Sequence, residues 1–365
     1  MKSTKTLKIA LIIDQPSWTG IGTYAHMLYY LIKDYCDVKF IYLGAHNDNS
    51  SIYENLKYVK YAKNPYLIPK IVKYNYRMFK KDIKFKDYIK HYLGAFYPTD
   101  LIDEKTIITV HDLIKDNYFL SLKFGIRELA TSFIRNRSVK NFKNVLNKKP
   151  FIIAISNNTA DAILKINKNS KITVIYHWID KNKFKFRDKS QSKEILGLNE
   201  NINYLLSVGS SRPNKRLDLI KSFADYLPIN WKLIKIGASI NSKNVLNYKN
   251  IDDEKYPLFF NASEAYLHMS DDEGLGIPLL EALGSGIPII ARKSKINSEV
   301  LGDYAIYLEQ DNKKYFQENM NNILSTIKIL QFKKDELDKL FKKYDLNNAR
   351  EKYLNFYKQF EHLQS

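Results

Sequence analysis

The chain has 365 residues, with 58 Lys and Arg against 39 Asp and Glu and a formal net charge of +19. At about 100–200 residues per domain the length predicts two domains, and 45% hydrophobic residues exclude a disordered chain. A single cysteine, Cys36, excludes an intramolecular disulfide and is typical of a reducing compartment. The apolar run Ile9–Ile13 is too short for a signal peptide, and no run approaches the about 18 apolar residues that span a bilayer. We therefore expect a cytoplasmic protein, soluble or at most peripheral on the inner face of a membrane.

The positive charge is concentrated in the first half. Residues 1–180 carry 29 Lys and Arg and 15 Asp and Glu, whereas residues 181–365 carry 29 and 24. Such an excess favours an anionic partner, which could be phospholipid, nucleic acid or a phosphorylated substrate. An AT-rich coding sequence, which favours Lys, Ile, Asn and Tyr, would explain the same composition.

In the first half, short β-branched runs alternate with amphipathic stretches, which is the pattern of a parallel sheet covered by helices. The predicted strands are Lys8–Ile13, Val38–Leu43, Thr106–Val110, Phe151–Ile155 and Ile172–Ile175. The predicted helices are Ile21–Lys33, Leu67–Phe79, Lys86–His91, Ser121–Asn147 and Asn157–Ile166. Ser156 stands where the N-cap of the last helix belongs.

A polar segment, Asp180–Glu200, is typical of an inter-domain connection, and a second alternation follows it. The predicted strands are Tyr204–Val208, Lys232–Ile236, Ala265–His268, Pro288–Ala291 and Ala305–Leu308. The predicted helices are Leu217–Tyr226, Glu254–Asn261, Pro278–Leu283, Asn297–Val300, Tyr315–Lys328 and Asn347–His362. The fold class is therefore α/β, with two doubly wound, Rossmann-like halves whose carboxyl strand edges we expect to face a central cleft.

The segment Ser270–Leu283 carries the clearest chemistry. A predicted strand leads into a glycine-containing turn, and Pro278 suits the first position of the helix that follows. Backbone N–H groups at such a helix start suit a diphosphate. These groups belong to Gly274, Leu275, Gly276 and Ile277. Glu281, about one turn into the helix, can aim a carboxylate at a ribose diol, and Glu273 precedes the turn. Alternatively, both glutamates are solvated helix-end carboxylates.

A second loop, Val208–Arg216, directly follows another strand of the same half. Its three cations, Arg212, Lys215 and Arg216, lie within five residues on a Gly/Ser/Pro-rich loop and could neutralise a pyrophosphate leaving group. The alternative is a polar turn with surface cations.

Two loops of the first half complete the candidate site. Gly20, Gly22 and Ala25 satisfy G-x-G-x-x-A, but they come too late after the strand for a dinucleotide turn. We expect these glycines to let the loop approach a ligand closely. His111 ends a strand and could hydrogen-bond a sugar hydroxyl, although a structural role is the alternative. No D-x-D triplet and no zinc-like His/Cys spacing occur, so we expect neither metal nor other cofactor.

Together these segments resemble the retaining glycosyltransferases of the GT-B group called family 4, or glycosyl transferases group 1. The resemblance runs from LKIALIIDQPSWTGIGTYA through TIITVHDL, FIIAISNNTADAIL and ITVIYHWID to LLSVGSSRPNKRLDLI and HMSDDEGLGIPLLEALGSGIPII. The most specific element is Glu-x7-Glu, from Glu273 to Glu281. The resemblance implies a GT-B fold with an acceptor domain at residues 1–176 and a sugar-nucleotide domain at 177–345. It also implies a final helix, 346–365, that packs back on the first domain.

The resemblance also implies roles for single residues. Glu281 resembles the glutamate that binds the ribose hydroxyls, and Glu273 the one beside the donor sugar. Lys215 resembles the lysine that binds the donor phosphates, and His111 the histidine that contacts the transferred sugar. The loop with Gly20 and Gly22 resembles the one under the donor phosphate. Many members have an arginine where this chain has Ser210, and we expect Arg212 to supply that charge.

The function that we expect is retaining transfer of a hexose from a UDP- or GDP-linked sugar to a hydroxyl acceptor, a glycan or a lipid-linked glycan. Glu273, His111 and Lys215 are the expected catalytic residues. Basic, aromatic-bearing helices at residues 70–90 and 123–149 could dock on an anionic membrane, or they could be plain solvated faces. Two alternatives stay open. One is a nucleic-acid-binding or nucleic-acid-glycosylating protein, less favoured because no recognition module is present. The other is a non-catalytic sugar-nucleotide-binding protein.

Overall fold

A computed structural model describes residues 7–48, 50–63, 67–94, 99, 101–113, 136, 140, 142–330 and 334–361. The chain divides into two compact units. Unit 1 comprises Met1–Leu113, Arg137–His177 and Leu346–Ser365. Unit 2 comprises Ile114–Asn136 and Trp178–Asp345. Unit 1 is therefore discontinuous, because its last segment follows unit 2 along the chain.

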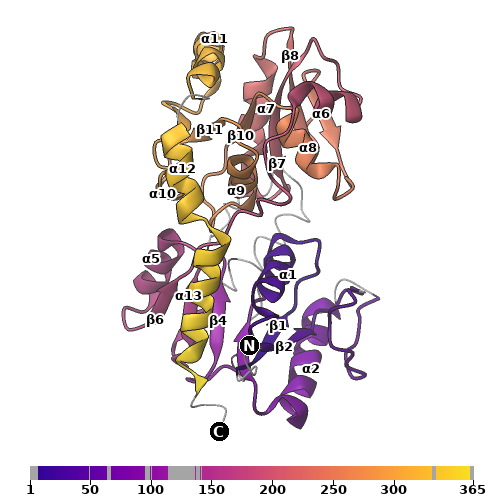
Figure 1. The fold of residues 1–365 in the computed structure, drawn as a ribbon, viewed down its shortest axis with the longest axis vertical. Helices are drawn as coiled ribbons and strands as arrows, with labels where there is room; N and C mark the ends of the chain where they lie inside the picture. The colour runs from indigo at the N-terminus through magenta and orange to yellow at the C-terminus, as the bar shows by residue number, and fades with distance from the viewer. Residues whose placement is uncertain are drawn as a thin grey trace. The chain divides into compact units, whose positions relative to one another are not determined.

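Unit 1 is built on a six-stranded parallel sheet with the strand order β2-β1-β3-β4-β5-β6 (Figure 1). The strands are β1 (Lys8–Ile13), β2 (Asp37–Tyr42), β3 (Ile89–Tyr92), β4 (Ile107–Val110), β5 (Phe151–Ala154) and β6 (Lys171–Val174). The apolar run of β1 is buried on both faces, as expected of a central strand in a sheet covered by helices on both sides. All five strands predicted for this half are confirmed to within one residue at either end.

Helices cover both faces of this sheet. They are α1 (Gly20–Ile32), α2 (Ile68–Lys80), α5 (Asn157–Ile166) and α13 (Leu346–Lys358), with a short 3₁₀ turn, η2 (Ile83–Phe85). Tyr92 joins the core cluster of α2, whereas its neighbour His91 hydrogen-bonds with Tyr357 of α13. Successive strand residues point to opposite faces, so α2 and α13 cover opposite sides. Ser156 accepts a hydrogen bond from the Thr159 N–H, which confirms the predicted N-cap of α5.

A chain of buried hydrogen bonds attaches α13 to the sheet of unit 1. Tyr353 Oη lies 2.5 Å from Tyr24 Oη, which contacts Thr109 Oγ1 at 3.3 Å. Thr109 in turn hydrogen-bonds with His91 Nε2 at 2.8 Å, and His91 Nδ1 lies 2.7 Å from Tyr357 Oη. The network begins and ends on α13, which lies beside the strands of unit 1 (Figure 1). Helix α13 thus supplies hydrogen-bond partners to two buried polar side chains, Tyr24 and His91.

Unit 2 has its own six-stranded parallel sheet, with the order β12-β11-β10-β7-β8-β9. Its strands are β7 (Asn203–Gly209), β8 (Trp231–Gly237), β9 (Val245–Tyr248), β10 (Ala265–His268), β11 (Ile289–Arg292) and β12 (Ala305–Leu308). Its helices are α6 (Lys189–Ile195), α7 (Leu217–Asp225), α8 (Tyr256–Asn261), α9 (Ile277–Gly284), α10 (Lys295–Leu301), α11 (Lys313–Leu330) and α12 (Lys334–Lys343), with a 3₁₀ turn, η3 (Pro213–Lys215). Leu205, Phe223, Leu267 and Phe316 lie in its core.

Four sequence predictions differ from the structure. The helix predicted at Lys86–His91 is wrong: its second half belongs to strand β3, where two polar side chains, Lys90 and His91, mask the strand pattern. The edge strand β9 was not predicted, because it has only four residues and an asparagine interrupts its apolar run. The segment Asp180–Glu200, expected to be only a connection, contains helix α6, and helix α12 was also missed.

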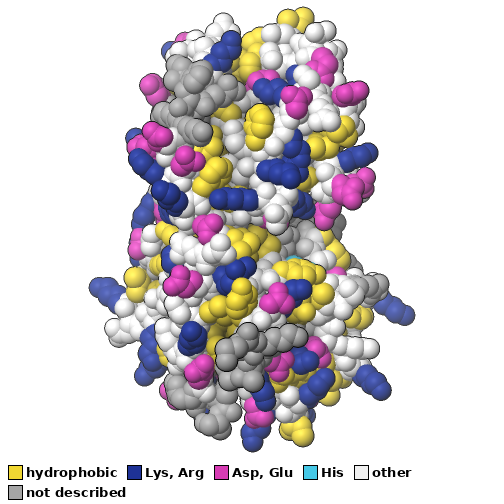
Figure 2. Space-filling view, viewed as in Figure 1, with side chains coloured by type: hydrophobic (Ala, Val, Ile, Leu, Met, Phe, Trp, Pro, Cys, Tyr) yellow, Lys and Arg dark blue, Asp and Glu magenta, His cyan; other side chains and the backbone are white. Residues whose placement is uncertain are grey.

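Part of the predicted helix Ser121–Asn147, most of the basic segment 123–149 and the end of the predicted tail helix lie outside the described residues. In the parts of the chain that the structure does describe, no helix is long and apolar enough to cross a bilayer. On the face seen in Figure 2, Lys and Arg side chains are spread among Asp and Glu rather than gathered in one patch.

Candidate functional site

Two loops at the carboxyl edge of the unit 2 sheet meet through an ion pair. The first loop follows β7 and contains η3; the second follows β10 and leads into α9. Lys215 Nζ lies 2.5 Å from Glu273 Oε1. The two strands are neighbours in the sheet, so their loops leave it side by side. The structure therefore brings together two residues that the sequence assigned to one site.

Asn214 fixes the spacing between these loops. Its side-chain NH₂ group donates to the Asp272 backbone carbonyl at 2.9 Å, and the backbone carbonyl of Asn214 accepts from the Asp271 N–H at 2.8 Å. Asn214 is itself buried. The two loops are therefore joined by hydrogen bonds of Asn214 as well as by the ion pair between Lys215 and Glu273.

Glu273 is buried and remains a carboxylate at neutral pH. Burial alone would raise its pKa, but the Lys215 ammonium, His268 and a hydrogen bond from Ser270 together hold the pKa below its ordinary value. His268 is also buried, which lowers its pKa to about 4 and keeps the imidazole neutral. At neutral pH the Lys215 ammonium group is therefore paired with the Glu273 carboxylate.

Helix α9 begins in this second loop, and Gly276 makes its start possible. Gly276 is the N-cap, with φ of 87°, a conformation that residues with a Cβ adopt only with strain. A Cβ there would also lie 3.0 Å from Leu279 Cδ1. The helix starts at Ile277, so Pro278 occupies its second position and not the predicted first. The N–H groups before the first full turn have no intrahelical acceptor and can bind an anion.

Glu281 lies in the second turn of the same helix. The hydroxyl of Tyr256 donates to Glu281 Oε2 at 2.7 Å. Burial raises the pKa of Glu281 to about 7, although the Tyr256 hydrogen bond and Lys183 act in the opposite direction. Its second carboxylate oxygen can accept a further hydrogen bond, as a diol ligand would require.

Lys235 is a residue of this site that the sequence analysis missed. It lies on β8, fully buried, and donates to the carbonyl oxygens of Gly209 at 2.8 Å and Ile236 at 2.7 Å. Burial, with repulsion from Lys215, lowers the pKa of Lys235 to about 7. Lys235 and Lys215 line the same small depression at the strand ends. The buried Lys235 ammonium group thus supports the Gly209 carbonyl, and so the start of the loop that carries Lys215.

The two arginines of the first loop differ in their roles. Arg216 has φ of 50° and binds Asp218 at 2.9 Å and Asp271 at 3.0 Å, which raises its pKa. It is therefore committed to structure and is not one of three cations open to a ligand. Arg212 is the half-buried N-cap of η3, three residues before Lys215.

In unit 1, the loop with Gly20 and Gly22 forms the start of α1. Thr19 is the N-cap and accepts from the Gly22 N–H at 3.0 Å. A Cβ on Gly22 would lie 1.9 Å from the Pro16 carbonyl oxygen, whereas one on Gly20 would meet nothing within 4 Å. The close approach at Gly22 is therefore made by the chain's own backbone, and the open space is at Gly20.

His111 follows strand β4 and is buried. Its Nε2 donates to the Leu93 carbonyl at 3.0 Å, which leaves Nδ1 as the acceptor nitrogen. Burial lowers its pKa to about 4, so the imidazole is neutral at physiological pH. Its ring meets Tyr24 edge-on, and His177 stacks on the same tyrosine. His111 can thus accept a hydrogen bond from a hydroxyl but is not an acid at neutral pH.

Metal ligands are not clustered around these loops. Among the residues that the structure describes, no group of three or more His, Cys, Asp or Glu side chains is arranged to hold a metal ion. Glu273 is engaged by Lys215, and Glu281 by Tyr256.

Comparison with known families gives a match inside unit 2. Residues 188–336 match the family model described as Glycosyl transferases group 1. The matched segment contains both loops, with Lys215, Glu273 and Glu281.

Three curated proteins are similar in sequence. The chain is 28% identical over 232 residues to the O-antigen chain mannosyltransferase RfbU of Salmonella typhimurium, covering 59% of this chain and 60% of that protein. It is 22% identical over 254 residues to the O-antigen chain mannosyltransferase B of Escherichia coli (62% and 63%). It is 28% identical over 141 residues to the N-acetyl-alpha-D-glucosaminyl L-malate synthase of Bacillus anthracis (35% and 37%). These matches span less than two thirds of each relative.

Solved structures show the fold over nearly the whole chain. WaaG, a glycosyltransferase involved in lipopolysaccharide biosynthesis, superposes with a TM-score of 0.70 at 15% identity, over 95% of this chain and 99% of that one. Sucrose-phosphate synthase from Thermosynechococcus elongatus gives 0.73 at 15% (97% and 99%), and Anabaena Alr3699/HepE in complex with UDP-glucose gives 0.67 at 14% (96% and 99%). The chain has the GT-B fold.

Proposed function

We propose that this protein is a retaining glycosyltransferase that moves a hexose from a nucleoside diphosphate sugar to a hydroxyl acceptor. The observation that carries the proposal is the Lys215–Glu273 pair beside the start of α9. One cation, the N–H groups at the start of α9 and two carboxylates at one sheet edge match the charges and hydroxyls of a sugar nucleotide. The family match over the same loops supports this reading.

In the proposed reaction, negative charge builds on the leaving diphosphate. The bond between the sugar C1 and the diphosphate oxygen breaks, and its electron pair goes to the diphosphate. Lys215, Arg212 and the N–H groups of Gly274 to Ile277 would stabilise that charge where it develops. One well-placed donor of this kind contributes about 2.7–4 kcal/mol to transition-state stabilisation.

We propose that the acceptor attacks from the face that the diphosphate leaves. The acceptor oxygen bonds to C1, and its proton passes to the leaving diphosphate, so atoms and charge balance. Glu273 is tied to Lys215, which suits it to orient the sugar and not to form a covalent intermediate. His111, neutral and with Nδ1 as acceptor, would orient a sugar hydroxyl. No step needs a metal, and we expect full turnover in EDTA.

The relatives suggest which donors to test first. Two of them are named mannosyltransferases, which favours a mannosyl donor, and HepE was solved with UDP-glucose. The two mannosyltransferases are also named as O-antigen chain enzymes, which favours a glycan or lipid-linked glycan as acceptor. We further propose that the basic segments 70–90 and 123–149 hold the protein on the anionic inner face of a membrane.

The direct test is a panel of UDP-, GDP- and ADP-sugars, screened by thermal shift and then by release of nucleoside diphosphate. Lys215→Ala should lower donor turnover by about 100-fold or more, because one stabilising cation is lost. Glu281→Gln should raise the donor KM by about tenfold or more, because hydrogen bonds to a charged group are worth about 1.5–3 kcal/mol. The anomeric configuration of the product, read by NMR, tests retention.

Matched controls are Lys221→Ala on α7 and Glu318→Gln on α11. Both side chains are exposed and belong to the same unit. Normal turnover in a folded Lys215→Ala protein would overturn the donor-site assignment. Binding of a donor by the wild type without any nucleotide release, across a range of acceptors, would instead favour a non-catalytic sugar-nucleotide-binding protein.

A further inference from the structure

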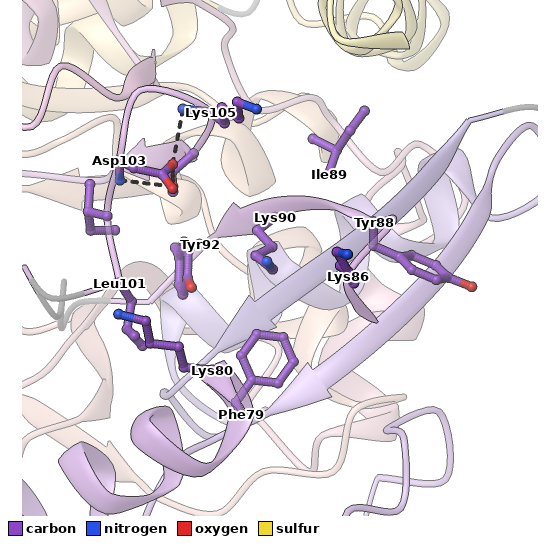
Figure 3. A pocket seen from close by; sticks show the side chains of 12 residues that line it. Phe79, Lys80, Lys86, Tyr88, Ile89, Lys90, Tyr92, Leu101, Asp103 and Lys105 are labelled. Carbon is purple, nitrogen blue, oxygen red and sulfur yellow. Dashed lines mark hydrogen bonds between the residues drawn. The ribbon is translucent and has the colours of Figure 1, made fainter. Parts of the chain in front are cut away.

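A pocket of about 220 Å³ lies in unit 1, at the amino edge of the sheet (Figure 3). Its walls come from the end of α2, from residues 86–92 that lead into and form β3, and from the loop that precedes β4. The glycine loop of α1 and His111 follow carboxyl strand ends, so the pocket lies at the other edge of the same sheet. The proposed sugar transfer uses none of its residues, although part of its wall belongs to the basic segment 70–90.

Four lysines line this pocket. They are Lys80, Lys86, Lys90 and Lys105. Within the part of the chain that the structure describes, no carboxylate comes within ion-pair distance of Lys86, Lys90 or Lys105. Several cations around one hollow repel each other, and a bound anion would relieve that repulsion.

The carboxylate on the pocket wall, Asp103, accepts hydrogen bonds from its own loop. Asp103 accepts from the Thr106 hydroxyl at 2.6 Å and from the Lys105 N–H at 3.0 Å, as the dashed lines in Figure 3 show. It shapes the loop before β4 and does not neutralise a neighbouring ammonium group. The lining thus keeps a net positive charge.

Lys90 is the most informative of the four. It lies on β3, which has β1 on one side and β4 on the other, and it is half-buried. Tyr88, Lys90 and Tyr92 alternate with residues of the other face, so Lys90 points into the α2 side between two aromatic rings (Figure 3). A lysine at an interior strand loses side-chain freedom and solvation, and no carboxylate offsets that loss.

The rest of the wall is apolar. Phe79 at the end of α2 and Leu101 in the loop before β4 flank the lysines, and the ring of Tyr88 is held by its hydroxyl, which donates to Asp37 at 2.8 Å. A flat or aliphatic group could therefore lie against one side while an anion meets the ammonium groups.

We propose that this pocket binds a phosphate or diphosphate group, with the group attached to it lying against Phe79, Tyr88 and Leu101. Lys86, Lys90 and Lys105 donate to the phosphate oxygens, as lysines commonly do in phosphate sites. The phosphate can belong to a soluble ester or to a lipid headgroup, because both present the same oxygens. This inference does not rest on the sugar-transfer reaction, since the pocket belongs to unit 1 and the loops after β7 and β10 belong to unit 2.

The test compares two triple variants of the full chain that remove the same charge. The pocket set is Lys86→Gln, Lys90→Gln and Lys105→Gln. The control set, Lys165→Gln, Lys168→Gln and Lys352→Gln, removes three exposed lysines elsewhere in unit 1. Binding of inorganic pyrophosphate is measured by calorimetry, and binding to phosphatidylcholine vesicles with phosphatidic acid by co-sedimentation. We expect the pocket set to weaken at least one of these by about tenfold or more relative to the control set.

Asp103→Asn provides a change in the opposite direction. It removes the negative charge but keeps an oxygen for the loop hydrogen bonds, so it should tighten the same probe; a misfolded protein would not. A loss on pyrophosphate alone assigns a soluble phosphate ester, and a loss on vesicles alone assigns a lipid headgroup. Equal losses in both triple sets, or no loss in the pocket set, would overturn the proposal. Donor turnover serves as a separate readout, and we expect it to be unchanged without vesicles.

Discussion

Lys235 and Glu281 of unit 2 both have pKa values near 7, reached by shifts in opposite directions from their ordinary values. Burial disfavours the charged form of each, so it lowers the pKa of the lysine and raises that of the glutamate. Below pH 7 Lys235 is charged and Glu281 is neutral; above pH 7 the reverse holds. A nucleoside diphosphate would favour a charged lysine beside its phosphates and a charged glutamate at its diol.

Donor affinity should therefore be highest near pH 7 and fall on both sides, by up to about tenfold per pH unit. Lys235→Met should make the donor affinity independent of pH above 7, because no proton is then taken up when the donor binds. Glu281→Gln should flatten the acidic side. The measurement is the donor Kd by calorimetry from pH 5.5 to 9, with Lys221→Met as the exposed control. Unchanged pH curves in both variants would show that neither group is linked to binding.

At the scale of elements, helix α9 has a glycine with positive φ at each end. Gly276 is its N-cap, with φ of 87°, and Gly286 follows its C-cap, with φ of 70°. A Cβ on Gly286 would meet no atom within 4 Å, whereas one on Gly276 would press on Leu279. At both positions a residue with a Cβ would be strained by the positive φ, but only at Gly276 would the Cβ also contact a neighbouring side chain.

Gly276→Ala and Gly286→Ala should each cost about 1–2 kcal/mol of stability, the cost of a left-handed alanine. Only Gly276→Ala should also weaken donor binding, because it turns the N–H groups at the helix start. Urea unfolding gives the first quantity and calorimetry the second. If Gly286→Ala weakens donor binding as much, the effect reflects general loss of stability and not the geometry of the helix start.

The elements were predictable where local sequence decides them. Strands such as β1 and β4 follow from β-branched runs, and α5 from its Ser156 cap. Strand β3 was not predictable, because Lys90 and His91 are polar. Only the folded structure shows that Tyr357 of α13 and Thr109 of β4 hydrogen-bond with His91, and that Lys90 lines the pocket. The residues of the two loops after β7 and β10 could be chosen as candidates because they follow strand ends. Lys235 could not, since the Gly209 carbonyl that it binds lies on a neighbouring strand and 26 positions away.

At the scale of the molecule, the two units should respond separately to damage. Tyr357→Phe removes the hydroxyl that meets His91 Nδ1, and leaves a buried polar atom without its partner at a cost of about 1–3 kcal/mol. We expect faster hydrogen exchange in β3 and β4 and unchanged exchange in β7 and β10, measured by mass spectrometry. Tyr30→Phe, at an exposed tyrosine of α1, is the control. Equal acceleration in both units would mean that they unfold as one.

The position of α13 in the chain also has a consequence for biosynthesis. A ribosome makes the strands of unit 1 first, but α13 emerges only after residues 178–345 have been added, which at 5–20 residues per second takes roughly 10–30 s. During that time Tyr24 and His91 of the nascent chain lack the hydrogen bonds that the hydroxyls of Tyr353 and Tyr357 later make with them. Unit 2, whose sheet is continuous in sequence, can therefore mature before the unit that was started first. A translation product that stops short of α13 would carry an unfinished first unit for chaperones and proteases to recognise.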